Sequence, residues 1–559
     1  MASAIVLLLL GYVFYGSWLA KQWGVDPTRK PPAHTMRDGV DYVPAKPVVL
    51  LGHHFASITG LEPVNGPVMA SVFGWAPVFL WCVLGGIFFG GLHDFGALFA
   101  SVRHDGKSMG EVIKDAMGKR ARRLLLVFEL ILLILVMASC VNSITNMLAS
   151  DGFGLRVNPS ENETVGMISA LFIALAFVYG IVINRFELGV APAAVAGILG
   201  VCLISFCGLR LGIAMPRTPW IVFLCVYITI ASLLPVWTLL RPRDYLSALL
   251  FWGLMILSVI GIAISGFTGT LTFELPAFRG WNSSIGSLFP TLFITVNCGV
   301  CGGYHALIAS GTTSKQLNSE ADAKLVGYGA MLTKSALSVI TLIAVGAMFT
   351  KYISGEVVSP TIVFAAGIAS MFGAETSSIY SLVYIMLTFA VSAFLLTNLD
   401  TSTRVSRFVW TEFLLKEGET SWRDASGMRK VLAHPLVSAL IMVVISGTLG
   451  ALKLVQIWAL FSAASQLLGV LALLAVAAWL GNVGKNNKMF YFPMTFMLIA
   501  TLCSLCTTVT TKVGLIAGGG AMWGDYFQLV FAAAMVVLAV ILAIEGVQTM
   551  MKQGKGVKA

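Results

Sequence analysis

The stretch Leu51-Gly-His-His-Phe-Ala-Ser-Ile-Thr-Gly60-Leu-Glu-Pro-Val-Asn-Gly-Pro67 combines the length of a membrane span with residues that a continuous membrane helix disfavours. It lies in an apolar run, 48–73, that is long enough to cross a bilayer. Lipid offers no partner for a freed backbone group, so such a segment is tolerated only where it is buried in protein or lines a cavity. Pro63 and Pro67 cannot donate to the preceding turn, and two neighbouring glycines loosen it. We predict a discontinuous helix whose unwound middle presents backbone groups to a ligand; the alternative is a proline-kinked helix with a purely structural role.

Composition indicates a polytopic membrane protein. The 559 residues are 57% hydrophobic and only 11% charged, with a mean hydropathy of +0.88, whereas soluble proteins carry about 25% charged residues. The net charge of +10 is interpreted as loop charge that orients helices, so no nucleic-acid partner is expected. Cys298-x-x-Cys301 and Cys503-x-x-Cys506 lie in hydrophobic helices, so we interpret them as packing residues and predict no metal site and no cofactor.

The apolar runs predict an all-α fold with about 15 transmembrane helices. The residues 356–375 are either a re-entrant piece or a loop. With an outside N-terminus and a cytoplasmic C-terminus, the basic segments 21–47, 101–123 and 404–430 all fall on the cytoplasmic side, and the acidic segment 150–163 falls outside.

A second interruption is expected at Pro235. If the broken helix is the first of a core, Pro235 interrupts the sixth, which runs in the opposite direction. Interruptions at corresponding places in successive five-helix units point to a five-plus-five inverted repeat with a site at the bilayer midplane.

The predicted domains follow from this numbering. A ten-helix core, 48–400, comprises repeats 48–214 and 219–400. The other segments are a helix and cytoplasmic linker at 1–47, a cytoplasmic loop at 401–434, and accessory helices with a cytoplasmic tail at 435–559. The peripheral helices are candidates for contacts between copies of the chain.

Polar residues also occur in two of the following helices. Asp94 follows Gly86 and Gly90 at helical spacing, and an ionisable residue within a span is a functional hypothesis by default; the alternative is a cap for the next basic loop. Asn142 belongs to a polar stripe that is either a substrate wall or a contact between helices.

The eighth core helix, Phe289 to Gly311, is predicted to place Asn297 and His305 on one face, with Ser310 and Thr312 at its inner end. Lys334 and Asp400 are further candidates that we place at the membrane interface. Asp400 and Arg404 have the spacing of a local salt bridge.

Motifs for catalysis are missing from the sequence. It contains no phosphate-binding glycine-rich loop and no His-Glu-x-x-His. We therefore predict that the protein is not an enzyme and that an ion gradient supplies the energy.

Several long stretches together resemble the carbon starvation protein A (CstA) family of peptide and pyruvate transporters, over roughly residues 20–480. The matching pieces are Asp26-Pro-Thr-Arg, Asp38-Gly-Val-Asp-Tyr-Val-Pro44, Gly52-His-His-Phe, Gly66-Pro-Val, Asp94-Phe, Arg103-His-Asp-Gly-Lys-Ser108, Leu234-Pro-Val-Trp, Arg241-Pro-Arg-Asp-Tyr-Leu-Ser247, His305-Ala-Leu-Ile-Ala-Ser-Gly-Thr-Thr313, Gly327-Tyr-Gly, Asp400, Thr403-Arg and Gln466-Leu-Leu. The resemblance is to a compact branch of the family. It implies inner-membrane uptake of small carboxylates or peptides during nutrient limitation, and membership of the amino acid–polyamine–cation superfamily. Glu62 and Asn65 stand where longer relatives carry small or apolar residues.

The sequence thus predicts an ion-coupled symporter that imports a small carboxylate such as pyruvate, or a short peptide, across the bacterial inner membrane. Half-helix N-termini suit a carboxylate. The substrate is expected to contact Gly60, Glu62, Asn65, Gly66, Asn142, Pro235 and Trp237.

The coupling ion is H+ or Na+, with H+ preferred. The candidates for proton handling are His53, His54, Glu62, Asp94 and His305. A sodium site would use the Thr59 carbonyl with Asn297, Ser310 or Thr312. Two alternatives remain: a nutrient sensor that binds without translocating, and a membrane-embedded metalloenzyme using His53, His54, His93 and His305.

Overall fold

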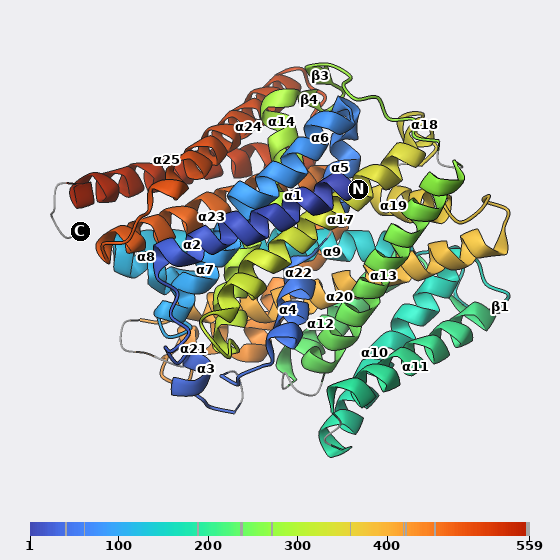
Figure 1. Cartoon of the computed structure of the whole chain (residues 1–559), viewed down its shortest axis with the longest axis horizontal. Helices are drawn as coiled ribbons and strands as arrows, with labels where there is room; N and C mark the ends of the chain where they lie inside the picture. Colours follow the sequence, from blue (N-terminus) through green and yellow to red (C-terminus); the bar gives the residue numbers. More distant parts are fainter. Residues whose placement is uncertain are drawn as a thin grey trace.

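The computed structural model describes residues 1–39, 42–60, 62–186, 189–234, 239–269, 272–357, 359–416, 419, 422–451 and 454–554. Eleven helices in this part of the chain are long and apolar enough to cross a membrane, and four apolar helices are shorter. The prediction of an all-α, multi-pass membrane protein is therefore confirmed (Figure 1). The number of fifteen spans stays a prediction.

The first half of the chain begins with a peripheral helix and continues through a broken helix to a series of long ones. The elements are α1 (Ala2–Leu10), η1 (Gly11–Gly16), α2 (Ser17–Trp23), α3 (Pro32–Thr35), α4 (Pro47–Ile58), α5 (Glu62–Ala70), η2 (Ser71–Phe73), α6 (Trp75–Leu80), η3 (Trp81–Gly90), α7 (Gly91–Arg103), α8 (Met109–Met117), α9 (Lys119–Leu148), β1 (Gly154–Val157), α10 (Glu161–Phe186), α11 (Val190–Arg210), β2 (Leu211–Ala214), α12 (Arg217–Leu233) and α13 (Leu240–Thr268).

The second half contains another broken helix. Its elements are β3 (Asn282–Ser283), β4 (Gly286–Ser287), α14 (Leu288–Thr295), α15 (Asn297–Val300), α16 (Tyr304–Gly311), η4 (Thr313–Lys315), η5 (Lys324–Gly329), α17 (Ala330–Ala347), α18 (Phe349–Ile353), α19 (Pro360–Ala369), α20 (Ser378–Leu414), α21 (Met428–Leu432), α22 (Pro435–Gly450), α23 (Leu454–Asn482), η6 (Lys488–Phe490), α24 (Tyr491–Ala517) and α25 (Trp523–Gly554).

The first predicted break is present. Helix α4 ends at Ile58, Thr59 has an extended backbone, and α5 begins at Glu62. Pro63 then lies in the first turn of α5, where a missing N–H costs nothing because that donor would have no helical partner. The sequence therefore predicted this discontinuity correctly, but the predicted interruption at Pro67 is wrong, because Pro67 lies inside α5.

The prediction of a continuous eighth core helix is wrong. The segment from Phe289 to Gly311 forms three short helices, α14, α15 and α16, and Cys301 between the last two is non-helical. The glycines that follow Asn297 loosen the helix, because glycine tolerates backbone conformations that other residues disfavour.

The two broken helices cross where each of them carries a glycine. A Cβ on Gly66 of α5 would lie 2.9 Å from the carbonyl oxygen of Thr295, and one on Gly299 of α15 would lie 3.2 Å from the carbonyl oxygen of Glu62. Two interrupted backbones can approach this closely only without side chains between them.

The predicted break at Pro235 falls outside the described residues. Helix α12 ends at Leu233 and the separate long helix α13 begins at Leu240, and Trp237 also lies outside the described residues.

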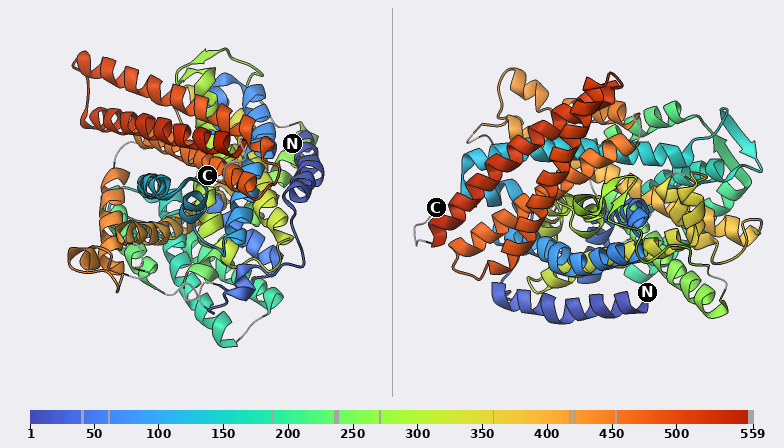
Figure 2. Two further views of the ribbon diagram at one scale, coloured as in Figure 1. Left: turned by 90° about the vertical axis from the view of Figure 1, so that its left-hand side faces the viewer. Right: turned by 90° about the horizontal axis from the view of Figure 1, so that it is seen from above.

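Long helices enclose both breaks. The long helices α9 and α20 pack against each other; α13 packs on α4, α17 on α5, and α23 on α14 to α16. Figure 2 shows that α1–α2 and the α24–α25 pair lie on opposite sides of this core. The α10–α11 hairpin lies at a third edge (Figure 1), where β1 pairs with β2.

The segment 356–375 contains the ten-residue helix α19, which is buried against α5, α17 and α20. A helix of this length is too short to cross a bilayer. The interpretation of this segment as a re-entrant piece is therefore favoured over a loop.

Candidate transport site

The end of α4 presents a freed carbonyl to a buried lysine. The break leaves the Ile58 carbonyl without a helical donor, and Lys334 Nζ of α17 donates to it at 2.7 Å. Lys334 Nζ also lies 3.4 Å from Glu62 Oε2, and that same carboxylate oxygen accepts from the Gly60 N–H at 2.8 Å. Lys334 is fully buried within the protein, and its location at the membrane interface stays a prediction.

Lys334 connects the break to a histidine–carboxylate cluster. Its Nζ lies 2.7 Å from His305 Nε2, and His305 Nδ1 lies 2.8 Å from Asp94 Oδ2. A charged lysine only donates, so His305 Nε2 accepts and His305 Nδ1 carries the proton that is donated to Asp94. His93 Nδ1 is bonded to the other Asp94 oxygen at 2.7 Å.

These contacts form a continuous buried relay, Glu62–Lys334–His305–Asp94–His93, built from α5, α17, α16 and α7. The structure thus brings together three residues that the sequence selected for ion coupling, Glu62, Asp94 and His305. Asp94 pairs with two histidines and does not cap the following loop. Sequence reasoning undervalued Lys334, although a lone lysine in an apolar span is itself a functional signal.

His93, Asp94 and His305 are also the group of described residues that could hold a metal ion, with ligand atoms within 4.8 Å of one another. Lys334 places a positive charge against His305, and each of the three residues already bonds within the relay. This donor set therefore fits protons better than a divalent cation. The other two histidines of the metalloenzyme alternative have different partners: His53 contacts Asp244, and His54 Nδ1 lies 2.8 Å from Thr313 Oγ1.

A second buried network surrounds Arg243 in the first turn of α13. Arg243 pairs with Asp400 of α20, and both bond the hydroxyl of Tyr227 of α12 at 2.7 Å. Its neighbour Asp244 lies 3.3 Å from His53 of α4. Four helices meet at these five side chains.

The predicted local pair of Asp400 with Arg404 is wrong. Arg404 instead donates to the carbonyls of Ala231 and Leu234 at the end of α12. Carbonyls at a helix C-terminus lack helical donors, which makes a guanidinium a suitable partner.

Several buried polar atoms near the two breaks have no partner among the described residues. They are both amide atoms of Asn65, Ser57 Oγ, Thr59 Oγ1, Asn297 Oδ1 and Ser335 Oγ. Buried polar atoms in proteins are normally satisfied by protein, water or ligand. Their concentration around the breaks favours a polar ligand or water there.

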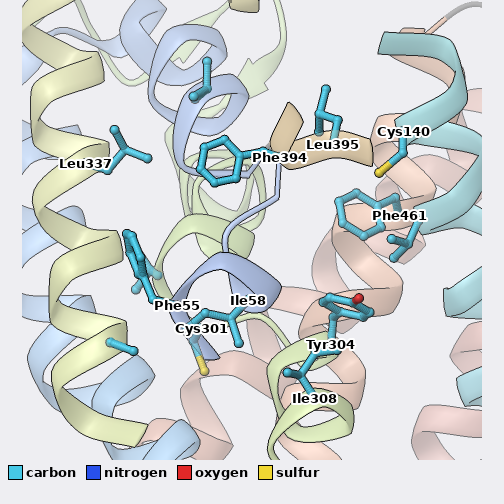
Figure 3. Packing of buried hydrophobic residues seen from close by; sticks show 14 of the residues in the cluster. Phe55, Ile58, Cys140, Cys301, Tyr304, Ile308, Leu337, Phe394, Leu395 and Phe461 are labelled. Carbon is cyan, nitrogen blue, oxygen red and sulfur yellow. The ribbon is translucent and has the colours of Figure 1, made fainter. Parts of the chain in front are cut away.

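Buried side chains of α16 and α20 pack around the end of α4 (Figure 3). Phe55 and Ile58 of α4, Tyr304 and Ile308 of α16, and Phe394 of α20 are all buried. The hydroxyl of Tyr304 lies 3.0 Å from Ser402 Oγ. The amide of Asn398, oriented to satisfy its surroundings, donates to the Ser57 carbonyl and to Tyr304 and accepts from Gly60.

Four other predicted residues bond to nearby backbone. Asn142 donates to the Gly450 carbonyl at 2.9 Å, which joins α9 to α22 and favours the helix-contact interpretation. Asn297 donates to the Cys301 carbonyl within the second break. Ser310 and Thr312 donate to carbonyls of their own helix.

Comparison with known proteins identifies relatives along most of the chain. The family described as carbon starvation protein CstA matches residues 1–357 and 351–504. The peptide transporter CstA of Campylobacter jejuni is 30% identical over 89% of this chain and 78% of its own length. The peptide transporter CstA of Bacillus subtilis is 29% identical over 87% of this chain and 86% of its own length.

Relatives in Escherichia coli include the pyruvate/proton symporter BtsT, 34% identical over 61% of this chain. That alignment spans 48% of the relative's own length. A solved manganese transporter of Eremococcus coleocola superposes over 92% of this chain and 99% of its own, with a TM-score of 0.49 and 12% identity, a similarity that supports no conclusion about cargo. The matches to the family and to its peptide and pyruvate transporters establish that the chain belongs to the carbon starvation protein CstA family, a family of membrane transporters.

Proposed function

We propose that the protein is a proton-coupled symporter of the bacterial inner membrane that imports a small carboxylate such as pyruvate, or a short peptide, when nutrients are limiting. Its relatives are named as peptide transporters and a pyruvate/proton symporter. The N-terminus lies outside and the C-terminus in the cytoplasm, in keeping with the distribution of lysine and arginine.

The observation that carries this proposal is the buried relay from Glu62 through Lys334 and His305 to Asp94. Ionisable residues inside a membrane protein mark ion and proton paths because burying them without function is costly. A histidine between an ammonium and a carboxylate can accept and release a proton. A sodium ion at the same place would lie against the positive charge of Lys334, so protons are the preferred coupling ion.

The relay provides a direct link between protonation and the broken helix. A second proton on His305 would sit on Nε2, facing the Lys334 ammonium only 2.7 Å away. Like-charge repulsion would then move Lys334 away from His305 and toward Glu62 and the Ile58 carbonyl. Because both groups flank the break, a proton at His305 changes the contacts that position the two half-helices.

The repeat boundaries consistent with this arrangement differ from those expected from Pro235. Both broken helices, α4–α5 and α14–α16, are followed by a long helix that contains a π-helical stretch, η3 between α6 and α7 and η5 directly before α17. The next long helices, α9 and α20, pack on each other, as do α12 and α22. We assign the two units to 47–268 and 288–482, with α10–α11 as an additional hairpin in the first.

Uptake by purified protein in proteoliposomes tests the function. An inward proton gradient should drive accumulation of pyruvate or of a dipeptide, and a sodium gradient alone should not. Binding of these compounds without any accumulation would instead identify a nutrient sensor. Stoichiometric zinc or iron in the purified protein, together with turnover of a substrate, would support the metalloenzyme alternative.

A further inference from the structure

Arg243 is among the largest fully buried side chains of the protein. It belongs to the first turn of α13 and is surrounded by α4, α12 and α20. A buried guanidinium is costly unless its charge is paired and its donors are bonded. How its five N–H donors are used therefore indicates whether Arg243 is a finished structural contact.

The Nη1 group of this guanidinium has close hydrogen-bond partners, whereas the Nε–Nη2 edge does not. Nη1 pairs with Asp400 and donates to the Tyr227 hydroxyl at 2.7 Å. Nη2 has only two contacts at 3.5 Å, to Asp244 Oδ1 and to the Thr397 carbonyl. Nε is buried and has no partner among the described residues. The Nε–Nη2 edge thus lacks the close acceptors that a buried arginine normally has.

This edge has the geometry that carboxylates prefer. The parallel N–H bonds of a guanidinium edge bind both oxygens of one carboxylate, and such bidentate pairs are among the strongest polar contacts in proteins. Asp400 does not make that contact, since it approaches through Oδ2 and its buried Oδ1 has no partner in the described structure. Arg243 is thus a buried guanidinium whose Nε–Nη2 edge has no close acceptor among the described residues.

The charges around Arg243 indicate that a carboxylate bound there would be accompanied by a proton. The titratable and charged groups facing Arg243 are Asp400 of α20, Tyr227 of α12, its own neighbour Asp244, and His53 of α4 behind Asp244. With His53 neutral, one arginine faces two aspartates. A further carboxylate would leave two uncompensated negative charges unless a proton entered with it. His53 Nε2 and Asp400 Oδ1, both buried without partners among the described residues, are the atoms available to take it.

The position of Arg243 fits a substrate path through the broken helix. Thr397, whose carbonyl faces Arg243, precedes Asn398, which bonds the last turn of α4 and Gly60 at the break. His53 lies on α4, so movement of this half-helix changes the contact with Asp244 directly.

We propose that Arg243 is the carboxylate-binding residue of the transport site and that its Nε–Nη2 edge binds the carboxylate of the substrate. One proton binds with the substrate, either at the His53–Asp244 pair or at Asp400. This inference rests on the proposed function and identifies a carboxylate as the group that the proposed substrates share. A 2-oxo acid and the C-terminus of a peptide both supply that carboxylate.

The test compares carboxylates with their neutral counterparts in proteoliposomes. Pyruvate is paired with pyruvamide, and a dipeptide with the same dipeptide amidated at its C-terminus; the two pairs distinguish the two sources of the carboxylate. The wild type should prefer the free acid of the pair that it transports. Arg243→Gln should raise the KM for that acid about 10-fold or more and abolish the preference. Arg217→Gln is the matched control. Arg217 is the first residue of α12 and donates to a backbone carbonyl, so this variant should keep both the KM for the acid and the preference for the acid.

If Arg243→Gln does not fold, the variant Asp400→Asn provides a second test of the same assignment. It removes a negative charge beside the guanidinium that repels the substrate carboxylate, so the KM for the acid should fall and accumulation driven by protons should weaken. An unchanged or higher KM in Asp400→Asn, or unchanged acid preference in folded Arg243→Gln, overturns the assignment of Arg243 while uptake by the wild type upholds the transport function. Failure of the wild type to transport any member of either pair would overturn both.

Discussion

The Nζ atom of Lys334 lies 2.7 Å from Nε2 of His305 and 2.7 Å from the carbonyl oxygen of Ile58, so one ammonium joins a titratable histidine to the end of an interrupted helix. A continuous helix would have used that carbonyl internally. The break therefore creates the acceptor that places Lys334, and Lys334 in turn faces the Glu62–Gly60 contact on the other side of the break.

Replacement of Lys334 by methionine tests this link. The variant keeps the length of the side chain but leaves Glu62 and the Ile58 carbonyl without their buried donor, which should cost about 3–5 kcal/mol in interaction free energy. We expect uptake to be abolished and the melting temperature of the purified protein to fall. The double variant Lys334→Met with Glu62→Gln should recover part of the stability but not the transport. Full uptake by Lys334→Met alone would exclude Lys334 from coupling.

Glu62→Gln separates coupling from binding. If Glu62 takes part in proton transfer, the amide keeps the shape and removes the titration, so accumulation against a gradient should fail. Exchange of labelled for unlabelled substrate at equal concentrations should continue, because exchange needs no net proton movement. Loss of both modes with a higher KM would show instead that Glu62 contacts the substrate. Unchanged accumulation would remove Glu62 from the relay.

Gly66→Ala tests the crossing of the two broken helices. The new methyl group would lie 2.9 Å from the Thr295 carbonyl oxygen, which is backbone and cannot rotate away. Overpacking of this kind costs about 1–3 kcal/mol, so the variant should melt at a lower temperature and transport more slowly.

The control for this substitution is Gly253→Ala in the interior of α13, where the structure leaves open space around the new Cβ. Alanine there should stabilise the helix by about 0.5–1 kcal/mol. Equal melting temperatures for the two variants would contradict the crossing geometry.

Membrane orientation can be tested by labelling. A cysteine introduced at Ser160, before α10, should react with a membrane-impermeant thiol reagent from outside intact cells. A reporter fused after the last residue should be active only in the cytoplasm. Labelling at Ser160 only after permeabilisation would reverse the orientation, and a reporter active outside would show that the number of spans is even.

The sequence by itself determined the membrane class, the family and the first break. Hydropathy is local, and the paired prolines and glycines between Gly60 and Pro67 act on the backbone of their own turn, so neither needs a distant residue to be recognised. It also selected Glu62, Asp94 and His305, because an ionisable residue at bilayer depth stands out wherever it occurs.

Only the tertiary structure decided which of these residues act together. The Glu62–Lys334 and His305–Asp94 contacts join residues separated by 272 and 211 positions, and no local pattern encodes such pairs. The same holds for Asp400, whose spacing suggested Arg404 but whose partner is Arg243 on another helix. The sequence also did not predict the second break, because the glycines that follow Asn297 permit both a continuous and an interrupted helix. Local rules find polar groups in a membrane protein, whereas helix packing pairs them, since a buried charge is stabilised by whichever partner the fold brings within reach.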